Sequence, residues 1–512
     1  MRLLTSVAAI AAALILPVAA HAADAPVEVT LDTSKPGAVI DRHIFGQFAE
    51  HLGSGIYGGI WVGKDSTIPN TRGIRNDVVT ALKALKVPDV RWPGGCFADQ
   101  YNWRRGVGPE RKPAVGEPNT FGTDEFMDFA QQIGTEAYIS VNLGSGTAQE
   151  ADEWLEYMTS SSTDSALGAE RAKNGHPEPY KVAILGLGNE SWGCGGAMSP
   201  DFYVNEMKRF SHFVHSYNPA QPMLRVAVGP SGTDPTYTEA VMKAWKDGSW
   251  SWGIEGLSLH YYSVGGWPPH MVDTGFDEKD YAILLKDSIG MDDTIKMQSA
   301  IMDKYDPEKK VALVVDEWGA WLVPASGANA GGAVQQNSQR DAVLAALHFN
   351  VFARHADRVR MANIAQMINV LQTMILTDKD KMVLTPTYHA FHMYVPFQDA
   401  TFLPLTFDAG TYTTNGVTLP RVDAIAARDK AGKIWIAVTN IDPKSPTTFS
   451  VSLAGVKATR ASGQTLAAPK VDSINTFDAP NTVAPKAIAA KVADGKLTIT
   501  VAPASITVLG LE

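Results

Sequence analysis

The sequence predicts an α/β protein in which a (β/α)8 barrel is followed by a β-sandwich. From about residue 40 to 385, short apolar runs alternate with amphipathic stretches of helical period, which is typical of βα units around a parallel sheet. After about residue 386 the helical period disappears and short alternating strands take over, as in a β-sandwich. With 512 residues, 45% of them hydrophobic, the chain is long and apolar enough for two cores.

Eight apolar runs are the candidate barrel strands. They begin near Ile44 and continue at 90–92, 137–141, 182–187, 224–228, 257–260, 311–315 and 359–364. Eight strands with interleaved helices favour a TIM barrel, although a doubly wound parallel sheet gives a similar one-dimensional pattern.

The helices between these strands are predicted from apolar spacing. Val78, Ala81, Leu82 and Leu85 fall at i, i+3, i+4 and i+7, so they form one buried stripe. Phe126, Phe129, Ala130 and Ile133 repeat the same spacing. Ser199 followed by Pro200 predicts a helix N-cap with proline at the first helical position.

The sandwich is predicted from alternation of period two. Phe449, Val451 and Leu453 alternate with serines, and the segment 497–501 alternates in the same way. A short strand at 27–31 has no parallel partner in the barrel count, so we expect it to join the sandwich. The expected organisation is an N-terminal strand segment at 23–39, a catalytic barrel at 40–385 and a sandwich at 386–512.

The first 22 residues have the composition of a secretory signal peptide. Arg2 precedes an apolar stretch, residues 7–18, and Ala20-His21-Ala22 is a small-x-small cleavage pattern. The stretch is shorter than the roughly 20 residues of a membrane-spanning helix. We therefore expect a periplasmic or secreted protein with no membrane contact after cleavage; a retained N-terminal anchor is the alternative.

Charge and cysteine content exclude several classes of function. The 44 Lys+Arg and 54 Asp+Glu give a net charge of -10 without a basic run, which argues against a nucleic-acid partner and for a neutral substrate. Cys96 and Cys194 lack the paired spacing of a zinc site, and the chain has no HExxH motif. We expect no metal and no cofactor, and hence insensitivity to chelators.

Two glutamates close apolar runs of the predicted barrel. Glu190 follows the fourth run and Glu317 follows the seventh, and catalytic groups of such barrels lie at the carboxyl ends of strands. Runs four and seven face each other across the mouth, so the two carboxyls could act on one molecule, as in glycoside hydrolysis. A pair of solvated acids is the alternative. Asp316 competes with Glu317, because successive strand residues point to opposite sides.

Six motifs in sequence order carry a family resemblance. They are Phe45-Gly46-Gln47-Phe48-Ala49-Glu50-His51-Leu52-Gly53, Arg91-Trp92-Pro93-Gly94-Gly95, Tyr101-Asn102-Trp103, Gly188-Asn189-Glu190, Asp316-Glu317-Trp318 and Ile364-Ala365-Gln366. Together they resemble an α-L-arabinofuranosidase of glycoside hydrolase family 51, over residues 40 to 400.

The resemblance implies a retaining, double-displacement hydrolase that releases terminal non-reducing α-L-arabinofuranosyl residues. It assigns the acid/base to Glu190 and the nucleophile to Glu317, which decides against Asp316. The resting enzyme is then expected to hold Glu190 protonated and Glu317 ionised. The implied substrates are arabinan, arabinoxylan or arabino-oligosaccharides.

Supporting residues are also implied by the resemblance. Asn189 matches an asparagine that binds the 2-hydroxyl of the sugar, although it could instead cap a helix. Tyr262 is expected to orient the nucleophile and His260 to support the site; a buried structural pair is the alternative. Glu50 and Gln366 match positions that bind sugar hydroxyls.

Four further residues are candidates for the pocket. Arg91 ends the second strand and could hold Glu317 or another carboxylate ionised. Cys96 stands where many family members have asparagine, so it is only a candidate for the pocket wall, and an exported protein could oxidise it with Cys194 to a disulfide. Trp192 and Trp318 are expected at the pocket rim, where aromatic faces pack on sugar rings.

The residues are also compatible with other functions. A β-xylosidase or an endo-β-glucanase could use the same pair of carboxyls, and a non-catalytic carbohydrate-binding protein would use aromatic and polar residues without turnover. Nothing in the residues requires a homo-oligomer, and nothing excludes one.

Overall fold

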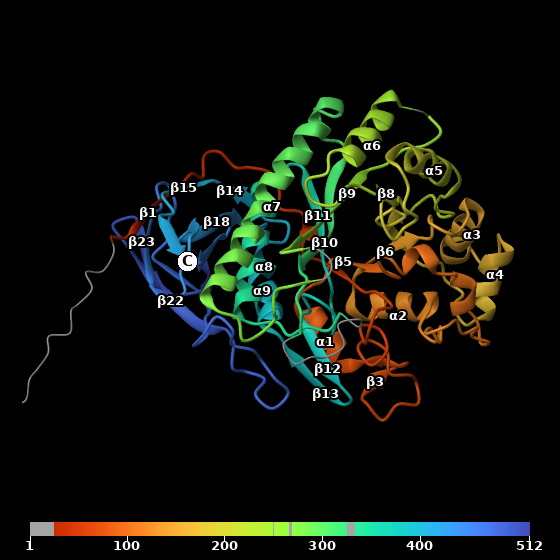
Figure 1. Ribbon diagram of the computed structural model, residues 1–512, viewed down its shortest axis with the longest axis horizontal. Helices are drawn as coiled ribbons and strands as arrows, with labels where there is room; N and C mark the ends of the chain where they lie inside the picture. The colour runs from red at the N-terminus through yellow and green to blue at the C-terminus, as the bar shows by residue number, and fades with distance from the viewer. Residues whose placement is uncertain (1–24, 249, 266–268, 325–332) are drawn as a thin grey trace, which may run out of the picture.

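Eight parallel strands form a closed barrel in the computed structural model, which describes residues 25–248, 250–265, 269–324 and 333–512 (Figure 1). The barrel strands are β2 (Gly46–Phe48), β5 (Asp89–Trp92), β6 (Glu136–Val141), β7 (Val182–Leu187), β8 (Leu224–Ala227), β9 (Gly256–Ser263), β10 (Ala312–Ala320) and β11 (Val359–Ile364). The last strand, β11, pairs in parallel with β2, so the sheet closes. This confirms the predicted barrel over a doubly wound sheet.

Each predicted apolar run corresponds to a strand, with small shifts at the ends. At the first run, Ile44 lies in a 3-10 helix, η1 (Arg42–Phe45), directly before β2. At the seventh run, β10 continues five residues beyond the predicted end, to Ala320. Asp41 begins η1 by accepting a hydrogen bond from the backbone N–H of His43. A polar cap ahead of an apolar run is a local signal that favours a helical turn over an extended strand.

Helices cover the outside of the barrel. They are α1 (Asn76–Ala84), α2 (Thr123–Ile133), α3 (Ala148–Thr159), α4 (Ala166–Lys173), α5 (Pro200–Phe213), α6 (Thr236–Asp247), α7 (Glu278–Tyr305), α8 (Gln339–Arg354) and α9 (Pro386–Tyr394). The predicted apolar stripes of α1 and α2 are buried. Ser199 caps α5 by accepting from Phe202 N–H, with Pro200 at the first helical position, as predicted.

The helix α9 lies beyond residue 385, where the sequence pattern indicated the end of the helical region. Thr385 caps it by accepting from Tyr388 N–H. The helix is buried on nearly all sides, so it has no polar face, and amphipathic periodicity could not indicate it. Its Tyr394 donates a hydrogen bond to Asn350 of α8.

The C-terminal strands form one sheet that folds over on itself. The order is β14-β18-β19-β24-β21-β22-β23-β20-β1-β15. The strands are β1 (Val27–Leu31), β14 (Thr401–Leu403), β15 (Leu405–Phe407), β18 (Val422–Arg428), β19 (Ile434–Asn440), β20 (Thr447–Ser452), β21 (Arg460–Leu466), β22 (Lys486–Ala493), β23 (Lys496–Val501) and β24 (Ser505–Leu511). Their inward side chains, among them Val29, Phe449 and Leu497, form a separate apolar core. The predicted C-terminal sandwich is thus confirmed.

The remaining strands are short antiparallel pairs: β3 (Asn70–Thr71) with β4 (Ile74–Arg75), β12 (Ile375–Asp378) with β13 (Lys381–Leu384), and β16 (Thr411–Thr414) with β17 (Val417–Pro420). Helices α7, α8 and α9 lie between the barrel strands and the blue strands of the sandwich (Figure 1). Tyr281 of α7 donates a hydrogen bond to the Ile441 carbonyl, and Arg354 of α8 pairs with Asp423 of β18. The barrel and the sandwich are therefore in direct contact. In the part of the chain that the structure describes, no helix has the length and apolar character to cross a bilayer.

Candidate active site

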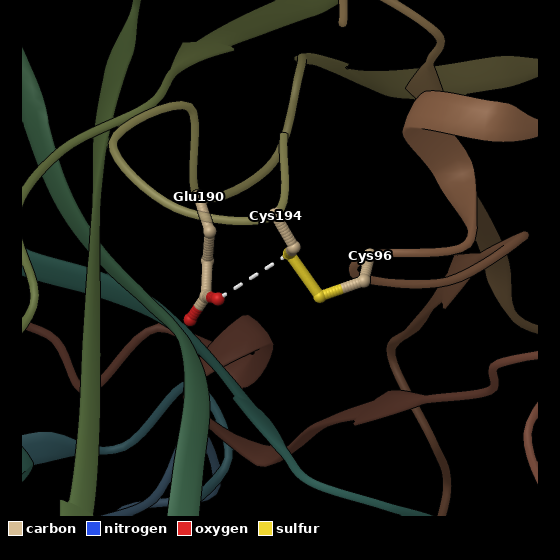
Figure 2. Close-up of side chains that lie close together, drawn as sticks. All are labelled: Cys96, Glu190 and Cys194. Carbon is tan, nitrogen blue, oxygen red and sulfur yellow. Dashed lines mark hydrogen bonds between the residues drawn. A yellow bond between two sulfur atoms is a disulfide. The ribbon is translucent and has the colours of Figure 1, made fainter. Parts of the chain in front are cut away.

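The loop after β7 carries Glu190 to the mouth of the barrel. Gly188 and Glu190 both have positive φ, 91° and 39°, so the chain turns sharply at the strand end. The same loop contains Cys194, which forms a disulfide with Cys96 from the loop after β5 (Figure 2). Cys194 Sγ lies 3.6 Å from Glu190 Oε2. A disulfide sulfur has no hydrogen, so this contact gives Oε2 no hydrogen bond.

Asp99 holds this loop from the side of β5 and β6. Its carboxylate accepts hydrogen bonds from the backbone N–H groups of Asn189, Leu143 and Gly144, at 2.9, 2.9 and 2.7 Å. Burial raises the pKa of Asp99 to about 7, although these donors favour the ionised form. The position of the Glu190 loop therefore depends on a buried acid that lies ninety residues before Asn189 in the chain.

A bulge in β10 places both Asp316 and Glu317 in the site. The register of β10 against β9 shifts between Val314 and Glu317, which interrupts the alternation of its side chains. Asp316 accepts from the Tyr138 hydroxyl inside the barrel at 2.8 Å, while Glu317 points to the mouth. The expectation that the two acids point to opposite sides of the strand is wrong for this reason, although only Glu317 points to the mouth.

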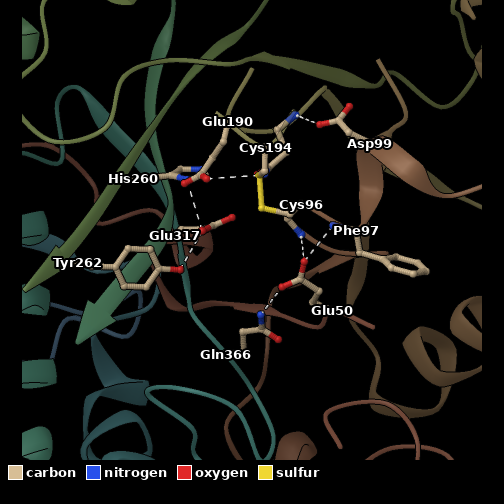
Figure 3. The surroundings of a disulfide bond; sticks show 12 residues. Glu50, Cys96, Phe97, Asp99, Glu190, Cys194, His260, Tyr262, Glu317 and Gln366 are labelled. Carbon is tan, nitrogen blue, oxygen red and sulfur yellow. Dashed lines mark hydrogen bonds and ion pairs between the residues drawn. A yellow bond between two sulfur atoms is a disulfide. The ribbon is translucent and has the colours of Figure 1, made fainter. Parts of the chain in front are cut away.

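Two donors fix the carboxylate of Glu317, and Figure 3 shows one of them, the hydroxyl of Tyr262. Arg91, at the end of β5, donates from Nη1 to Oε1 at 2.7 Å, and Tyr262 of β9 donates its hydroxyl to Oε2 at 2.8 Å. Arg91 also donates to the side-chain oxygen of Asn189 at 2.5 Å. A Cβ added at Gly95 would lie 2.8 Å from Glu317 Oε1, so only glycine leaves room at that position.

His260 of β9 lies between the two glutamates (Figure 3). Its Nδ1 is 2.8 Å from Glu190 Oε1 and 3.4 Å from Glu317 Oε2. The interacting atoms of these three residues all lie within 4.8 Å of one another. The structure thus brings the carboxyls of Glu190 and Glu317 together across the mouth of the barrel.

The charges around His260 are strongly coupled. Burial disfavours the imidazolium, but Glu317, Asp316 and Glu190 outweigh it and raise the pKa of His260 to about 10. For Asp316, burial is outweighed by Arg91 and His260, so its pKa is lowered. Arg91 is fully buried among these carboxylates, which raise its pKa further. Two fixed cations therefore stand among the acids of the site.

Glu50 and Gln366 form a second polar cluster beside the glutamate pair. Gln366 donates its amide to Glu50 Oε2 at 2.7 Å, and the backbone N–H groups of Gly95 and Phe97 donate to Oε1 at 3.0 and 3.2 Å. Burial, together with the charge of Glu317, raises the pKa of Glu50 to about 6. The cluster lies close to the disulfide in Figure 3.

The two predicted rim tryptophans lie in different environments. Trp192 is half-buried in the loop after Glu190 and donates its indole N–H to the Gly229 carbonyl at 3.2 Å. Trp318 is 0% exposed and packs on His348 and Phe391 behind the barrel wall. The prediction of Trp318 at the rim is wrong, because Trp318 directly follows Glu317 in β10 and therefore points to the opposite face of the strand, into the helix layer.

Two contributors were not predicted from the sequence: Asp99 and Tyr138. Asp99 lies between two recognised motifs, at 91–95 and 101–103, and that position was the available signal. Tyr138 is a mid-strand aromatic residue, which sequence alone does not distinguish from the core. A cavity of about 610 Å³ borders the site, with His260 and Tyr262 in its lining.

Fold and site together define a class of protein: a barrel glycoside hydrolase with two carboxyls at the ends of the fourth and seventh strands. Family models for the "Alpha-L-arabinofuranosidase 1 domain" and the "Alpha-L-arabinofuranosidase C-terminal domain" match residues 81–263 and 316–505. An intracellular exo-alpha-L-arabinofuranosidase of Bacteroides ovatus is 42% identical over 100% of this chain and 99% of its own.

Solved structures agree with this match. The GH51 arabinofuranosidase from Xanthomonas axonopodis pv. citri is 49% identical, with a TM-score of 0.92 over 95% of this chain and 100% of its own. The α-L-arabinofuranosidase from Thermotoga maritima, solved with arabinose, is 31% identical, with a TM-score of 0.80 over the same shares. The chain belongs to the α-L-arabinofuranosidases of glycoside hydrolase family 51.

One expectation is corrected by these comparisons. The Bacteroides ovatus relative, which matches along the full chain, is named as an intracellular enzyme, and this contradicts the expected periplasmic or secreted location. The predicted signal peptide, residues 1–22, lies outside the described residues. An apolar, alanine-rich N-terminus matches an export signal in composition, but composition alone does not establish export.

Proposed function

We propose that the protein is a retaining, exo-acting α-L-arabinofuranosidase that removes terminal non-reducing arabinofuranosyl residues from arabinan, arabinoxylan or arabino-oligosaccharides. One observation carries the proposal: a carboxylate oxygen of Glu190 and one of Glu317 lie within 4.8 Å of each other, and His260 contacts both glutamates. Retaining glycosidases hold their carboxyls about 5 to 5.5 Å apart, whereas inverting enzymes leave room for a water between them.

In the first displacement, Glu317 attacks the anomeric carbon while Glu190 protonates the leaving oxygen. Arg91 and Tyr262 each donate to one oxygen of Glu317, so the carboxylate is held in place for this attack. Glu190 forms a hydrogen bond with His260 through Oε1, and its Oε2 faces a sulfur that has no hydrogen. Oε2 is therefore the oxygen suited to carry the proton.

In the second displacement, Glu190 takes a proton from water, and the resulting nucleophile cleaves the arabinosyl ester of Glu317. The leaving carboxylate of Glu317 is again stabilised by Arg91 and Tyr262. Both steps pass through an oxocarbenium-like transition state with positive charge on the ring. The surplus of acids over cations near the ring favours that charge.

Other residues bind the sugar in this proposal. Asn189 has its side-chain oxygen held by Arg91, so its amide group, which lies 3.8 Å from the Cys194 sulfur, is the donor for the 2-hydroxyl of the sugar. Glu50 and Gln366 accept and donate hydrogen bonds with the other hydroxyls, from a cluster that Gly95 N–H and Phe97 N–H hold in place. Cys96 forms part of the pocket wall as one half of the disulfide, and it makes no polar contact with the sugar.

We further propose that residues 40–385, together with α9, form the catalytic unit, and that residues 386–512 beyond α9, joined by the segment 23–39, form a supporting unit. Contacts such as Arg354–Asp423 and the placement of β1 between β20 and β15 support this division.

The proposal is tested with 4-nitrophenyl α-L-arabinofuranoside. Glu317→Gln should lower kcat by about 10⁴-fold or more, because the covalent step is lost. Glu190→Ala should still release nitrophenol in a burst, because this leaving group needs little protonation, and azide should then accelerate turnover and yield the α-azide. A retained azide product from Glu317→Ala instead would reverse the two roles. Faster hydrolysis of the aryl β-xyloside would overturn the substrate assignment.

A further inference from the structure

We propose that reduction of the Cys96–Cys194 disulfide creates a binding site for one thiophilic divalent cation, formed by the two thiolates and the carboxylate of Glu190. Zn²⁺ is the physiological ion whose ligand preferences match this set. The bound cation would occupy the oxygen that the acid/base uses. The effect on activity rests on the function proposed for Glu190, whereas the binding itself does not.

The geometry already approaches that of a zinc site. One ligand atom from each of Cys96, Glu190 and Cys194 lies within 4.8 Å of the others, and Cys194 Sγ is 3.6 Å from Glu190 Oε2 (Figure 2). On a tetrahedral Zn²⁺, with Zn–S of about 2.3 Å and Zn–O of about 2.0 Å, sulfur and oxygen are about 3.5 Å apart. The pair of Cys194 and Glu190 therefore needs almost no rearrangement.

The two cysteines can reach one metal through side-chain rotation. Two sulfurs on the same tetrahedral Zn²⁺ are about 3.8 Å apart. The Cα atoms of Cys96 and Cys194 are separated by 5.5 Å, a distance that side-chain rotation can accommodate without moving the loops apart. Both cysteines are exposed, so a reductant and a cation have access to them.

Contacts other than the disulfide hold both loops in position. The loop of Cys96 is fixed by Gly95 N–H and Phe97 N–H, which donate to Glu50. The loop of Cys194 is fixed by Asn189 N–H, which donates to Asp99. Breaking the sulfur–sulfur bond therefore leaves the three ligands close together.

The chemistry balances with a small dithiol as the reductant. The dithiol gives two electrons and two protons to the disulfide, the sulfur–sulfur bond breaks, and two protein thiols and a cyclic disulfide result. Cation binding then releases the two thiol protons to solvent. Two thiolates and one carboxylate surround the dication, and water completes the tetrahedron.

A second group, formed by Glu190, His260 and Glu317, is equally compact but less suited to a cation. Both nitrogens of His260 already face carboxylates, with Nε2 3.3 Å from Asp316 Oδ1. The Arg91 guanidinium, 2.7 Å from Glu317, adds a fixed positive charge. The disulfide side of Glu190 is therefore the favoured place for the ion.

The test uses the full chain, whose only two cysteines are these. After anaerobic reduction and removal of the dithiol, a thiol reagent should count two thiols. Cd²⁺, titrated as a spectroscopic substitute, should produce an ultraviolet thiolate-to-metal absorption that saturates at one equivalent, and Zn²⁺ should displace it. The oxidised protein and the double variant Cys96→Ser/Cys194→Ser should give no such band.

Reduced Glu190→Gln should bind the cation at least about tenfold more weakly, because one anionic ligand is lost. The exposed control Glu110→Gln should bind the cation like the wild type.

One equivalent of Zn²⁺ should lower arabinofuranosidase activity of the reduced enzyme at least about tenfold, a chelator should restore it, and the oxidised enzyme should not respond. Unfolding on reduction, seen by circular dichroism, would overturn the proposal, as would no binding by the folded reduced protein or equal affinity in Glu190→Gln. If binding fails while the glutamate variants behave as described above, only the cation site is refuted. If the ion binds but activity persists, the acid/base role of Glu190 is refuted instead.

Discussion

His260 Nδ1 lies 2.8 Å from Oε1 of Glu190, and the ring thereby joins the proposed acid/base to the carboxylates on the opposite side of the barrel. Its other nitrogen is 3.3 Å from Asp316. The imidazolium is thus a fixed cation between acids that would otherwise repel one another. This arrangement links the stability of the barrel mouth to pH.

His260→Gln should flatten the alkaline dependence of stability. The folded pKa of His260, about 10, exceeds the value of about 6.5 for an unfolded histidine. Its contribution to stability is therefore complete below about pH 6.5 and is lost as the pH rises towards 10. The Tm of the wild type should fall between pH 7 and 10 by more than that of His260→Gln, measured by calorimetry. The exposed control His270→Gln should behave like the wild type; an equal fall in all three proteins would contradict the assignment.

Glu50→Gln should remove a titration from the acid side of the rate profile. The pKa of Glu50 is raised to about 6 by burial and by Glu317, so this carboxyl ionises between about pH 5 and 7. Because the ionised form binds sugar hydroxyls more strongly, kcat/KM for the aryl arabinofuranoside should rise over that interval. The variant should lose about tenfold to a hundredfold in kcat/KM at pH 7 and lack this rise. An unchanged profile would place Glu50 outside the sugar-binding site.

Asp99→Ala should impair the acid/base Glu190 through the loop that carries it, and not through a contact with the substrate. The change leaves three buried backbone donors without their acceptor, at a cost of about 3 kcal/mol in unfolding free energy. Because the loop of Glu190 is released, kcat should fall more for alkyl arabinofuranosides, which need protonation, than for the nitrophenyl substrate. Asp99→Asn, which keeps one acceptor oxygen, should recover part of both losses. Equal losses for both leaving groups would indicate a purely structural role.

Trp318→Ala and Trp192→Ala should distinguish a tryptophan of the core from a tryptophan at the rim of the pocket. Trp318 is fully buried against His348 and Phe391, so its truncation should cost about 3–5 kcal/mol in urea unfolding while KM of the folded enzyme stays unchanged. Trp192 is half-buried near Glu190, so its truncation should raise KM for oligosaccharides with little loss of stability. A raised KM for Trp318→Ala with little loss of stability would place Trp318 in the pocket.

The sequence by itself determined the barrel, the sandwich and the pair of glutamates. The barrel strands are continuous apolar runs and the sandwich strands alternate, so local periodicity distinguished the two regions. Helix α9 was not predicted, because burial on nearly all sides removes the polar face on which amphipathic periodicity depends. Glu190 and Glu317 were recognisable because a charged residue at the end of an apolar run is costly unless it is used.

Only the tertiary structure decided how those glutamates are held. The bulge in β10 brings Asp316 and Glu317 into the barrel interior together, and strand alternation could not predict this shift of register. The disulfide beside Glu190 joins segments that are about a hundred residues apart, and the hydrogen bond from Asn189 N–H to Asp99 joins segments about ninety residues apart. Side-chain spacing along a strand is a local property, whereas these contacts depend on how separate loops meet in space.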